Sequence, residues 1–215
     1  MEKRTCKPSL AIAAALLVVS TAVCAANDQS TAVYKADLKP LNANVTGLET
    51  QGDAELVVEG NMLEIQIEVK DAPPGITHWQ HFHGFIDGSE ASCPDGSADA
   101  NGDKIVDLIE THPYTGKTLV PFDAKPAAMD IAHGDYPEAN ADGTYAYSAT
   151  VPLDKLQNAF AKAYDGNELE LESRAIYIHG APLDIALPDS VASLGPIPAH
   201  TTLPIACGEL RRAEQ

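Results

Sequence analysis

Three histidines stand close together in the middle of the chain, at positions 78, 81 and 83. In an extended strand, side chains alternate between the two faces, so His81 and His83 are expected to project from the same face. Two imidazoles on one side of a rigid strand provide half of a transition-metal site, and imidazole binds copper, zinc, nickel and iron. The alternative is a pair of hydrogen-bonded or surface histidines without a metal. Because the chain has only seven histidines, their close spacing favours the metal site.

A third histidine, His179, closes an apolar segment much later in the chain. In a β-sandwich, two strands that are distant in sequence can lie side by side and bring three imidazoles to one ion. The alternative for His179 alone is a surface residue at the end of a strand. We therefore treat His81, His83 and His179 as one candidate metal site.

An acidic segment from residue 99 to 110 has the spacing of an EF-hand calcium loop. In such a loop oxygen ligands surround a hard cation, and a glutamate at the twelfth position binds through both oxygens. Lys104 stands at the sixth position, where glycine is usual because the backbone there needs a positive φ. The alternative is a solvated acidic loop, and the flanking prolines predict no helix on either side. The candidate calcium ligands are Asp99, Asn101, Asp103, Asp107 and Glu110.

The segments that must position these residues predict an all-β protein. Residues 62–69 alternate between apolar and polar side chains and follow residues 54–59 after Gly60-Asn61, a two-residue hairpin signal. We predict further strands at residues 31–38, 144–151, 168–171, 175–179 and 203–210, and a short helix within residues 152–164. Residues 87–134 show little periodicity, which predicts one long irregular loop of a functional or disordered kind.

The first 26 residues predict an export signal. A short basic start precedes an apolar run that is too short to span a bilayer, and small residues follow it. Lipid attachment at Cys24 is the alternative. The remaining segment, residues 27–215, has about the length of one domain with its own core. The protein is thus expected in the periplasm or outside the cell, with no membrane span.

The chain has 31 acidic and 14 basic residues and a net charge of −17. Removal of the predicted signal would make it more acidic, since the signal carries more basic than acidic groups. Such a chain repels nucleic acid and anionic membranes, so neither is an expected partner. Cys6 and Cys24 lie in the signal, so Cys93 and Cys207 remain. Two cysteines in an exported chain most simply form one disulfide, and two free thiols are the alternative.

Several short motifs resemble the copper/zinc superoxide dismutases. Residues 73–83, Pro-Pro-Gly-Ile-Thr-His-Trp-Gln-His-Phe-His, resemble the "PG-x-HGFHIH" strand of that family. Residues 133–135 resemble its "H-V-GDLGN" segment and residues 142–143 its "DG" turn. Residues 174–179 resemble its "R-x-h-V-V-H" strand, and residues 204–208 its terminal "R-L-A-C-G". These matches keep the family's order and extend from about residue 54 to 210, so together they are more specific than any one alone.

This resemblance implies a Greek-key β-sandwich or flattened barrel, here with the long acidic loop that the sequence pattern predicts. It implies that His81, His83 and His179 are copper ligands and that Cys93 and Cys207 are paired. It assigns His78 a structural place in the loop network and makes His133 and Asp135 candidates for zinc. The implied reaction is superoxide dismutation by cycling of Cu(II) and Cu(I), with superoxide as the small-molecule substrate.

The sequence departs from the family at two places. Asp99 stands where the imidazole that bridges copper and zinc is expected, so either His112 bridges the two metals or there is no bridge. A copper-only site and a copper-zinc site, with zinc on His112, His133 and Asp135, both remain open. Pro204 stands where the family has the arginine that guides the anion to copper. Because the chain is strongly acidic, this departure bears on dismutation more than on copper binding.

The ending Cys-Gly-Glu-Leu-Arg, residues 207–211, also resembles the "G-E-I-R" ending of chordin-type repeat domains. That resemblance implies a non-catalytic metal-binding or interaction domain, which is the alternative to the enzyme. A homodimer is left open by either interpretation.

Overall fold

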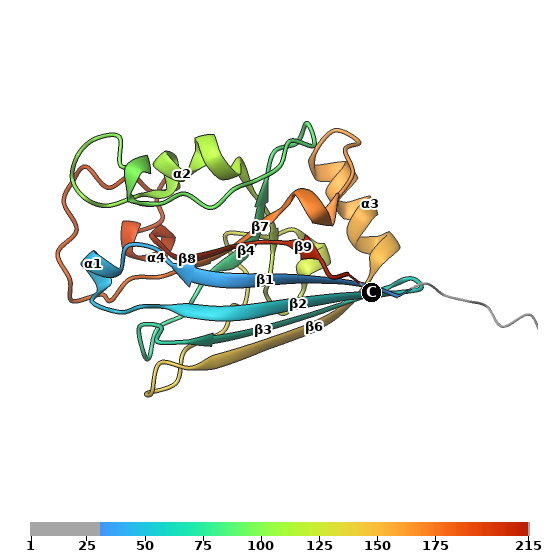
Figure 1. The fold of residues 1–215 in the computed structure, drawn as a ribbon, viewed down its shortest axis with the longest axis horizontal. Coiled ribbons are helices and arrows are strands. Elements are labelled where there is room, and N and C mark those ends of the chain that lie inside the picture. The colour runs from blue at the N-terminus through green and yellow to red at the C-terminus, as the bar shows by residue number, and fades with distance from the viewer. Residues whose placement is uncertain (1–30, 215) are drawn as a thin grey trace, which may run out of the picture.

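The computed structural model describes residues 31–214, and the predicted export signal lies outside them. The chain is mostly β, with a few short helices (Figure 1). No helix in this described part is long and apolar enough to cross a membrane. The strands are β1 (Ala32–Pro40), β2 (Gln51–Glu59), β3 (Met62–Lys70), β4 (Gln80–Gly84), β5 (Lys117–Pro121), β6 (Tyr145–Pro152), β7 (Ala175–His179), β8 (Pro204–Glu209) and β9 (Arg211–Arg212). The α-helices are α1 (Ala43–Thr46), α2 (Leu108–Thr115), α3 (Leu153–Ala163) and α4 (Ala199–Thr202), and the 3-10 turns are η1 (Gly96–Ala98), η2 (Pro126–Ala128) and η3 (Leu171–Ser173).

The strands form one curled antiparallel sheet, a half-barrel. Their order is β5-β4-β7-β8-β1-β2-β3-β6, and β9 pairs with β1. Strands that are distant in sequence therefore become neighbours, most importantly β4 and β7, which carry the candidate metal ligands. The expected predominance of antiparallel β-structure is confirmed, with a few short helices beside the sheet.

The β2–β3 hairpin is the part that the sequence pattern describes best. The two strands pair without interruption from Gln51↔Lys70 to Glu59↔Met62. The turn between them contains Gly60 at φ 56°, a conformation that favours glycine. The alternating apolar residues of β3 are fully buried on the concave face, whereas their polar neighbours are not. This face forms the main core.

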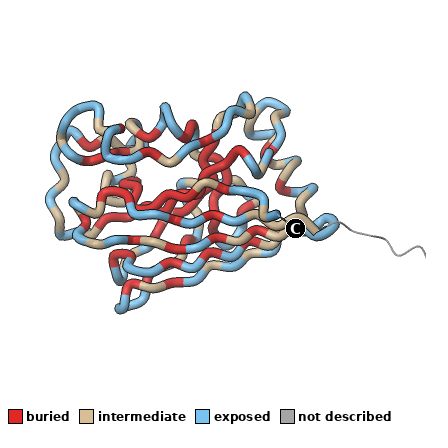
Figure 2. Tube along the Cα trace, viewed as in Figure 1, coloured by how far each residue is buried: buried red, intermediate tan, exposed pale blue. Residues whose placement is uncertain are grey.

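Helix α3 covers one end of that core. Leu156 and Phe160 are fully buried, as the predicted amphipathic helix requires. Figure 2 shows buried residues running along the strands and exposed residues concentrated in the loops and turns. Strands β4 and β7 are buried along their full length, so we expect this part of the sheet to be rigid.

The prediction of one irregular loop from residue 87 to 134 was wrong in part. This segment contains helix α2, strand β5 and two 3-10 turns. Asp107 caps α2 by accepting hydrogen bonds from the backbone N–H groups of Ile109 and Glu110, and Glu110 bonds back to the N–H of Asp107. This capping box starts helix α2. The sequence had argued against a helix here, because Pro113 lies within the segment. Strand β5 has only five residues, too few for a clear alternation.

The predicted strand at residues 168–171 was also wrong. Glu170 has a left-handed backbone with φ 39°, and the 3-10 turn η3 follows it. The buried guanidinium of Arg174 donates hydrogen bonds to the carbonyl oxygens of Leu169 and Glu168. These carbonyl groups accept hydrogen bonds from Arg174 and not from a neighbouring strand, so the segment does not join the sheet.

Candidate metal centre

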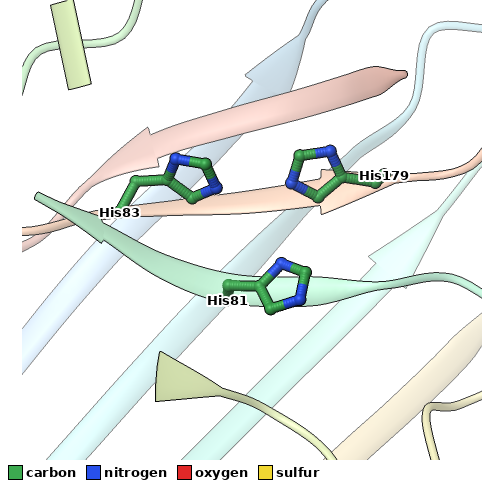
Figure 3. Close-up of side chains that lie close together, drawn as sticks. All are labelled: His81, His83 and His179. Carbon is green, nitrogen blue, oxygen red and sulfur yellow. The ribbon is translucent and has the colours of Figure 1, made fainter. Parts of the chain in front are cut away.

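The candidate ligands lie on two neighbouring strands in the buried part of the sheet. Strand β4 lies between β5 and β7, and its residues His81 and His83 point to one face. His179 is the last residue of β7, where its backbone N–H bonds to the carbonyl of Trp79 just before β4. Figure 3 shows the three imidazoles turned toward a common centre. The sheet pairing therefore assembles the candidate cluster of His81, His83 and His179.

The three rings form a compact and buried group. One nitrogen from each ring lies within 4.8 Å of the others, and no side chain of the three is more than 2% exposed. The Nδ1 atoms of His81 and His83 and the Nε2 atom of His179 have no hydrogen-bond partner. Buried polar atoms are normally paired, because an unpaired one costs free energy. A metal ion at the common centre would take one nitrogen from each of the three rings.

Hydrogen bonds around the cluster fix which nitrogen of two rings carries the proton. The hydroxyl of Tyr136 donates to the carbonyl of Ile131, so its oxygen accepts from Nε2–H of His81 at 2.9 Å. In the same way, Nδ1–H of His179 donates to the carbonyl of Thr202 at 2.8 Å. The lone pairs of His81 and His179 therefore lie on the two unpartnered nitrogens. Such outer hydrogen bonds orient metal-binding histidines and fix their tautomer.

Burial keeps the three imidazoles neutral. It lowers the pKa of His81 and His83 well below the ordinary value, and the neighbouring imidazoles lower it further. Burial also lowers the pKa of His179, to about 4. A neutral imidazole is the form that binds a metal, so the cluster is ready to bind at neutral pH.

We predict that the metal-free protein loses stability in mild acid. The ordinary imidazole pKa of 6.5 applies to the unfolded chain, whereas the folded values are lower, about 4 for His179. The unfolded chain therefore binds more protons between these values, and the free energy of unfolding falls as the pH drops from 6.5 toward 4. Urea denaturation across this window measures the effect. A constant midpoint would contradict the neutral, buried cluster.

Tyr136 is a positioning residue that the sequence analysis did not identify. Its ring packs edge-on against His81 and is stacked on Trp79. The position of Tyr136 in the sequence did not predict its contact with His81, because no spacing rule connects a tyrosine after Asp135 with the histidines. We predict that Tyr136→Phe weakens metal binding by about tenfold, since loss of such an outer partner typically costs 10–100-fold. Competition with a chromogenic chelator measures the affinity, with Tyr34→Phe as a control outside the cluster. Unchanged affinity in Tyr136→Phe would contradict the role.

A small pocket of about 10 Å³ adjoins the cluster. His81 and His179 line it together with Trp79, Leu108, Ile131 and Leu194, and no charged side chain among the described residues reaches it. A cavity of this size holds about one water molecule. The cluster therefore lies beside a small pocket that is lined mainly by apolar side chains, together with Thr118 and Thr202.

The residues predicted for zinc or a bridge are not gathered into a second site. His112 lies exposed on α2, where its charge still influences the pKa of His83. The His133 side chain is 82% exposed and bonds to Asp130, and Asp135 is exposed. In residues 31–214, the only three His, Cys, Asp or Glu side chains close enough to share an ion are those of the three-histidine cluster. The zinc and bridging assignments thus stay predictions.

The predicted calcium loop is tightly wound, with its acidic groups bonded to its own backbone. Asp99 accepts hydrogen bonds from the N–H groups of Gly102 and Lys104, and Lys104 has the positive φ, 70°, that its position demands. Glu110 accepts from the N–H groups of Ala100 and Asn101. The flank after the loop is helical, so the expectation of no helix there was wrong. The calcium assignment stays a prediction.

The remaining predicted residues have structural surroundings. Cys93 and Cys207 form a disulfide across 114 residues. His78 is fully buried, and its two ring nitrogens face the carbonyl oxygens of Pro73 and His179 at 2.9 Å. It connects the turn before β4 to the end of β7 and is not one of the three clustered histidines. This placement agrees with a structural role.

A scan against protein-family models and a search of curated proteins found no match to this chain. The three buried histidines in a curled antiparallel sheet are therefore the feature from which a function can be proposed.

Proposed function

We propose that this chain is an exported copper-binding protein of the superoxide dismutase type. The observation that carries the proposal is the convergence of three buried imidazoles from β4 and β7, each of which offers one nitrogen within 4.8 Å of the others. Imidazole suits copper, and three neutral nitrogens leave a position open for a small molecule. The strand order, in which β4 and β7 are brought together by long connections, also supports a Greek-key barrel of this family.

The residues present fit a copper ion. When bound, copper would supply one-electron chemistry that oxidises one superoxide to oxygen and reduces the next to hydrogen peroxide. Tyr136 and the carbonyl of Thr202 hold the rings of His81 and His179 in the tautomers that leave their lone pairs free. The apolar cavity beside them limits access to small molecules. These features support the copper assignment without the family's bridging histidine.

One observation favours a second candidate, a metal-binding protein without catalytic activity. Pro204 is buried where the family places its guiding arginine, and no cation lines the cavity in the part of the chain that the structure describes. The net charge of −17 repels superoxide, and no described side chain that lines the cavity compensates for it. Copper binding is unaffected by this feature, whereas rapid dismutation requires the anion to reach the site.

One experiment separates the two candidates. The mature, oxidised chain is loaded with copper and zinc, dialysed, and analysed for both elements before a direct dismutase assay. One retained copper with activity that His81→Ala abolishes supports the enzyme. One retained copper without activity supports the non-catalytic protein. Failure to retain copper would overturn both, and zinc retained beside copper would favour the site at His112, His133 and Asp135.

We also predict that calcium stabilises the loop from residue 99 to 110. Its carboxylates carry like charges within one short loop, and a hard cation would neutralise them. Thermal melting with calcium and with a chelator is expected to differ by a few degrees, about 1 kcal/mol in a chain of this size. Asp103→Ala should reduce the difference. Identical melting curves in wild type would favour the solvated acidic loop.

A further inference from the structure

The two edges of the sheet differ in how well they are protected. Strand β5 is short, starts with Lys117, ends with Pro121 and has an irregular register with β4. Charges, prolines and bulges are the features by which proteins prevent an edge strand from pairing with another chain. The edge at β5 is therefore protected in all of these ways.

Strand β6, at the other edge, has none of these protections along its length. Its eight residues carry no charge, and a proline stands only at the last position, Pro152. It pairs with β3 in an uninterrupted register and has no strand on its other side (Figure 1). A long, regular and neutral edge is a template for an added strand.

The pairing with β3 shows which backbone groups face outward. The N–H of Leu153 bonds to the carbonyl of Asn61, so every second residue before it shares hydrogen bonds with β3. The residues between them, Ala146, Ser148 and Thr150, therefore direct their N–H and carbonyl groups away from the sheet. All three side chains are exposed.

A groove of about 460 Å³ runs along this edge. One wall is the edge of β6, from Ala146 to Val151, and the other is formed by the segments around Asp123 and Asp135. These two aspartates are the only charged side chains that line it among the described residues, and neither forms an ion pair there. Asp123 is only 4% exposed, and burial raises its pKa. No described cationic side chain pairs with the Asp123 carboxylate, so a bound ligand could supply the missing positive charge.

We infer that the edge of β6 binds an extended, basic peptide segment of a partner protein, which adds to the sheet as a further strand. The outward backbone groups of Ala146, Ser148 and Thr150 would pair with the peptide backbone, and Asp123 and Asp135 would pair with its lysines or arginines. A second copy of the chain fits less well. Symmetric pairing of two β6 strands would bring two sets of these aspartates together in a chain that is already strongly acidic.

The test uses a fluorescent nine-residue peptide of alternating threonine and lysine, with blocked ends, and the same peptide with glutamate in place of lysine. Fluorescence anisotropy with the mature, oxidised chain is expected to show binding of the lysine peptide alone. Ser148→Pro removes an outward N–H without breaking the β3 ladder, so it should weaken binding by at least about tenfold. Ser148→Ala should bind like wild type, and Asp123→Asn with Asp135→Asn should weaken binding most at low salt.

A peptide with N-methyl groups on alternate amides repeats the test without changing the protein. It should fail to bind, because it cannot form the ladder with β6. Equal binding of the methylated and unmethylated lysine peptides would overturn the inference, as would equal binding of the lysine and glutamate peptides. Sedimentation of a wild-type dimer that Ser148→Pro converts to monomer would assign the edge to a second copy instead, and would also overturn it.

Discussion

The His83→Gln variant is expected to bind copper about a hundredfold more weakly than the wild-type chain. A structural metal site of four ligands provides roughly 10–16 kcal/mol, so the loss of one imidazole costs about 3 kcal/mol. His83 offers one ring nitrogen to the cluster from a side chain that is almost fully buried. No other described histidine can replace it, because the exposed His112 and His133 lie outside the cluster. Competition with a chelator of known affinity measures the change.

The same variant is expected to lose most of the thermal stabilisation by copper. Free copper at about a thousand times its dissociation constant stabilises a native protein by about 4 kcal/mol. In a chain of this size that raises the melting temperature by about 10 °C. The matched control is His133→Gln, which removes an exposed histidine and should keep the full shift. Equal shifts in wild type and His83→Gln would show that copper binds elsewhere.

Reduction of the Cys93–Cys207 disulfide is expected to lower the free energy of unfolding by about 4–5 kcal/mol. The bond closes a loop across 114 residues, and a loop of that size strongly restricts the unfolded chain. It attaches the segment after β4 to β8, whose Cys207 pairs with Tyr177 of β7. Urea denaturation of the oxidised and reduced chains measures the difference in midpoint.

The double variant Cys93→Ser with Cys207→Ser separates the bond from the reductant. It should match the reduced wild type, since both lack the same constraint on the unfolded chain. Midpoints that coincide for the oxidised chain and the double variant would mean that the disulfide contributes nothing measurable. Copper affinity should change little in either case, because His81, His83 and His179 are held by strand pairing.

The fold could be predicted from the sequence where one regular pattern decides the structure. Gly60-Asn61 and the alternation of residues 62–69 led to the β2–β3 hairpin, and the apolar run at residues 175–179 coincides with β7. Prediction failed where one specific contact outweighed the pattern. The capping box of Asp107 and Glu110 starts α2 despite Pro113, and Arg174 takes the carbonyl groups that a strand at residues 168–171 would have used.

The candidate site was only partly visible in the sequence. The spacing of His81 and His83 follows directly from strand geometry. The proximity of His179 required the resemblance to a known family, because only the sheet order brings β7 beside β4. Tyr136 and the carbonyl of Thr202 could not be foreseen, since their contacts depend on how two loops pack over the rings. Spacing identifies ligands within one strand, whereas outer partners require the three-dimensional structure.

The residues that cover the cluster come from three separate segments. Leu108 begins α2, Ile131 lies between η2 and β6, and Leu194 lies between β7 and α4, yet all three line the cavity beside His81 and His179. Because the three histidines are at most 2% exposed, we expect an ion to enter or leave when these segments part. Exchange will therefore proceed at the rate of this local opening, however strong or weak the equilibrium affinity. A metal captured as the chain folds would have a long residence time, and a chelator would remove it at a rate that does not depend on the chelator concentration.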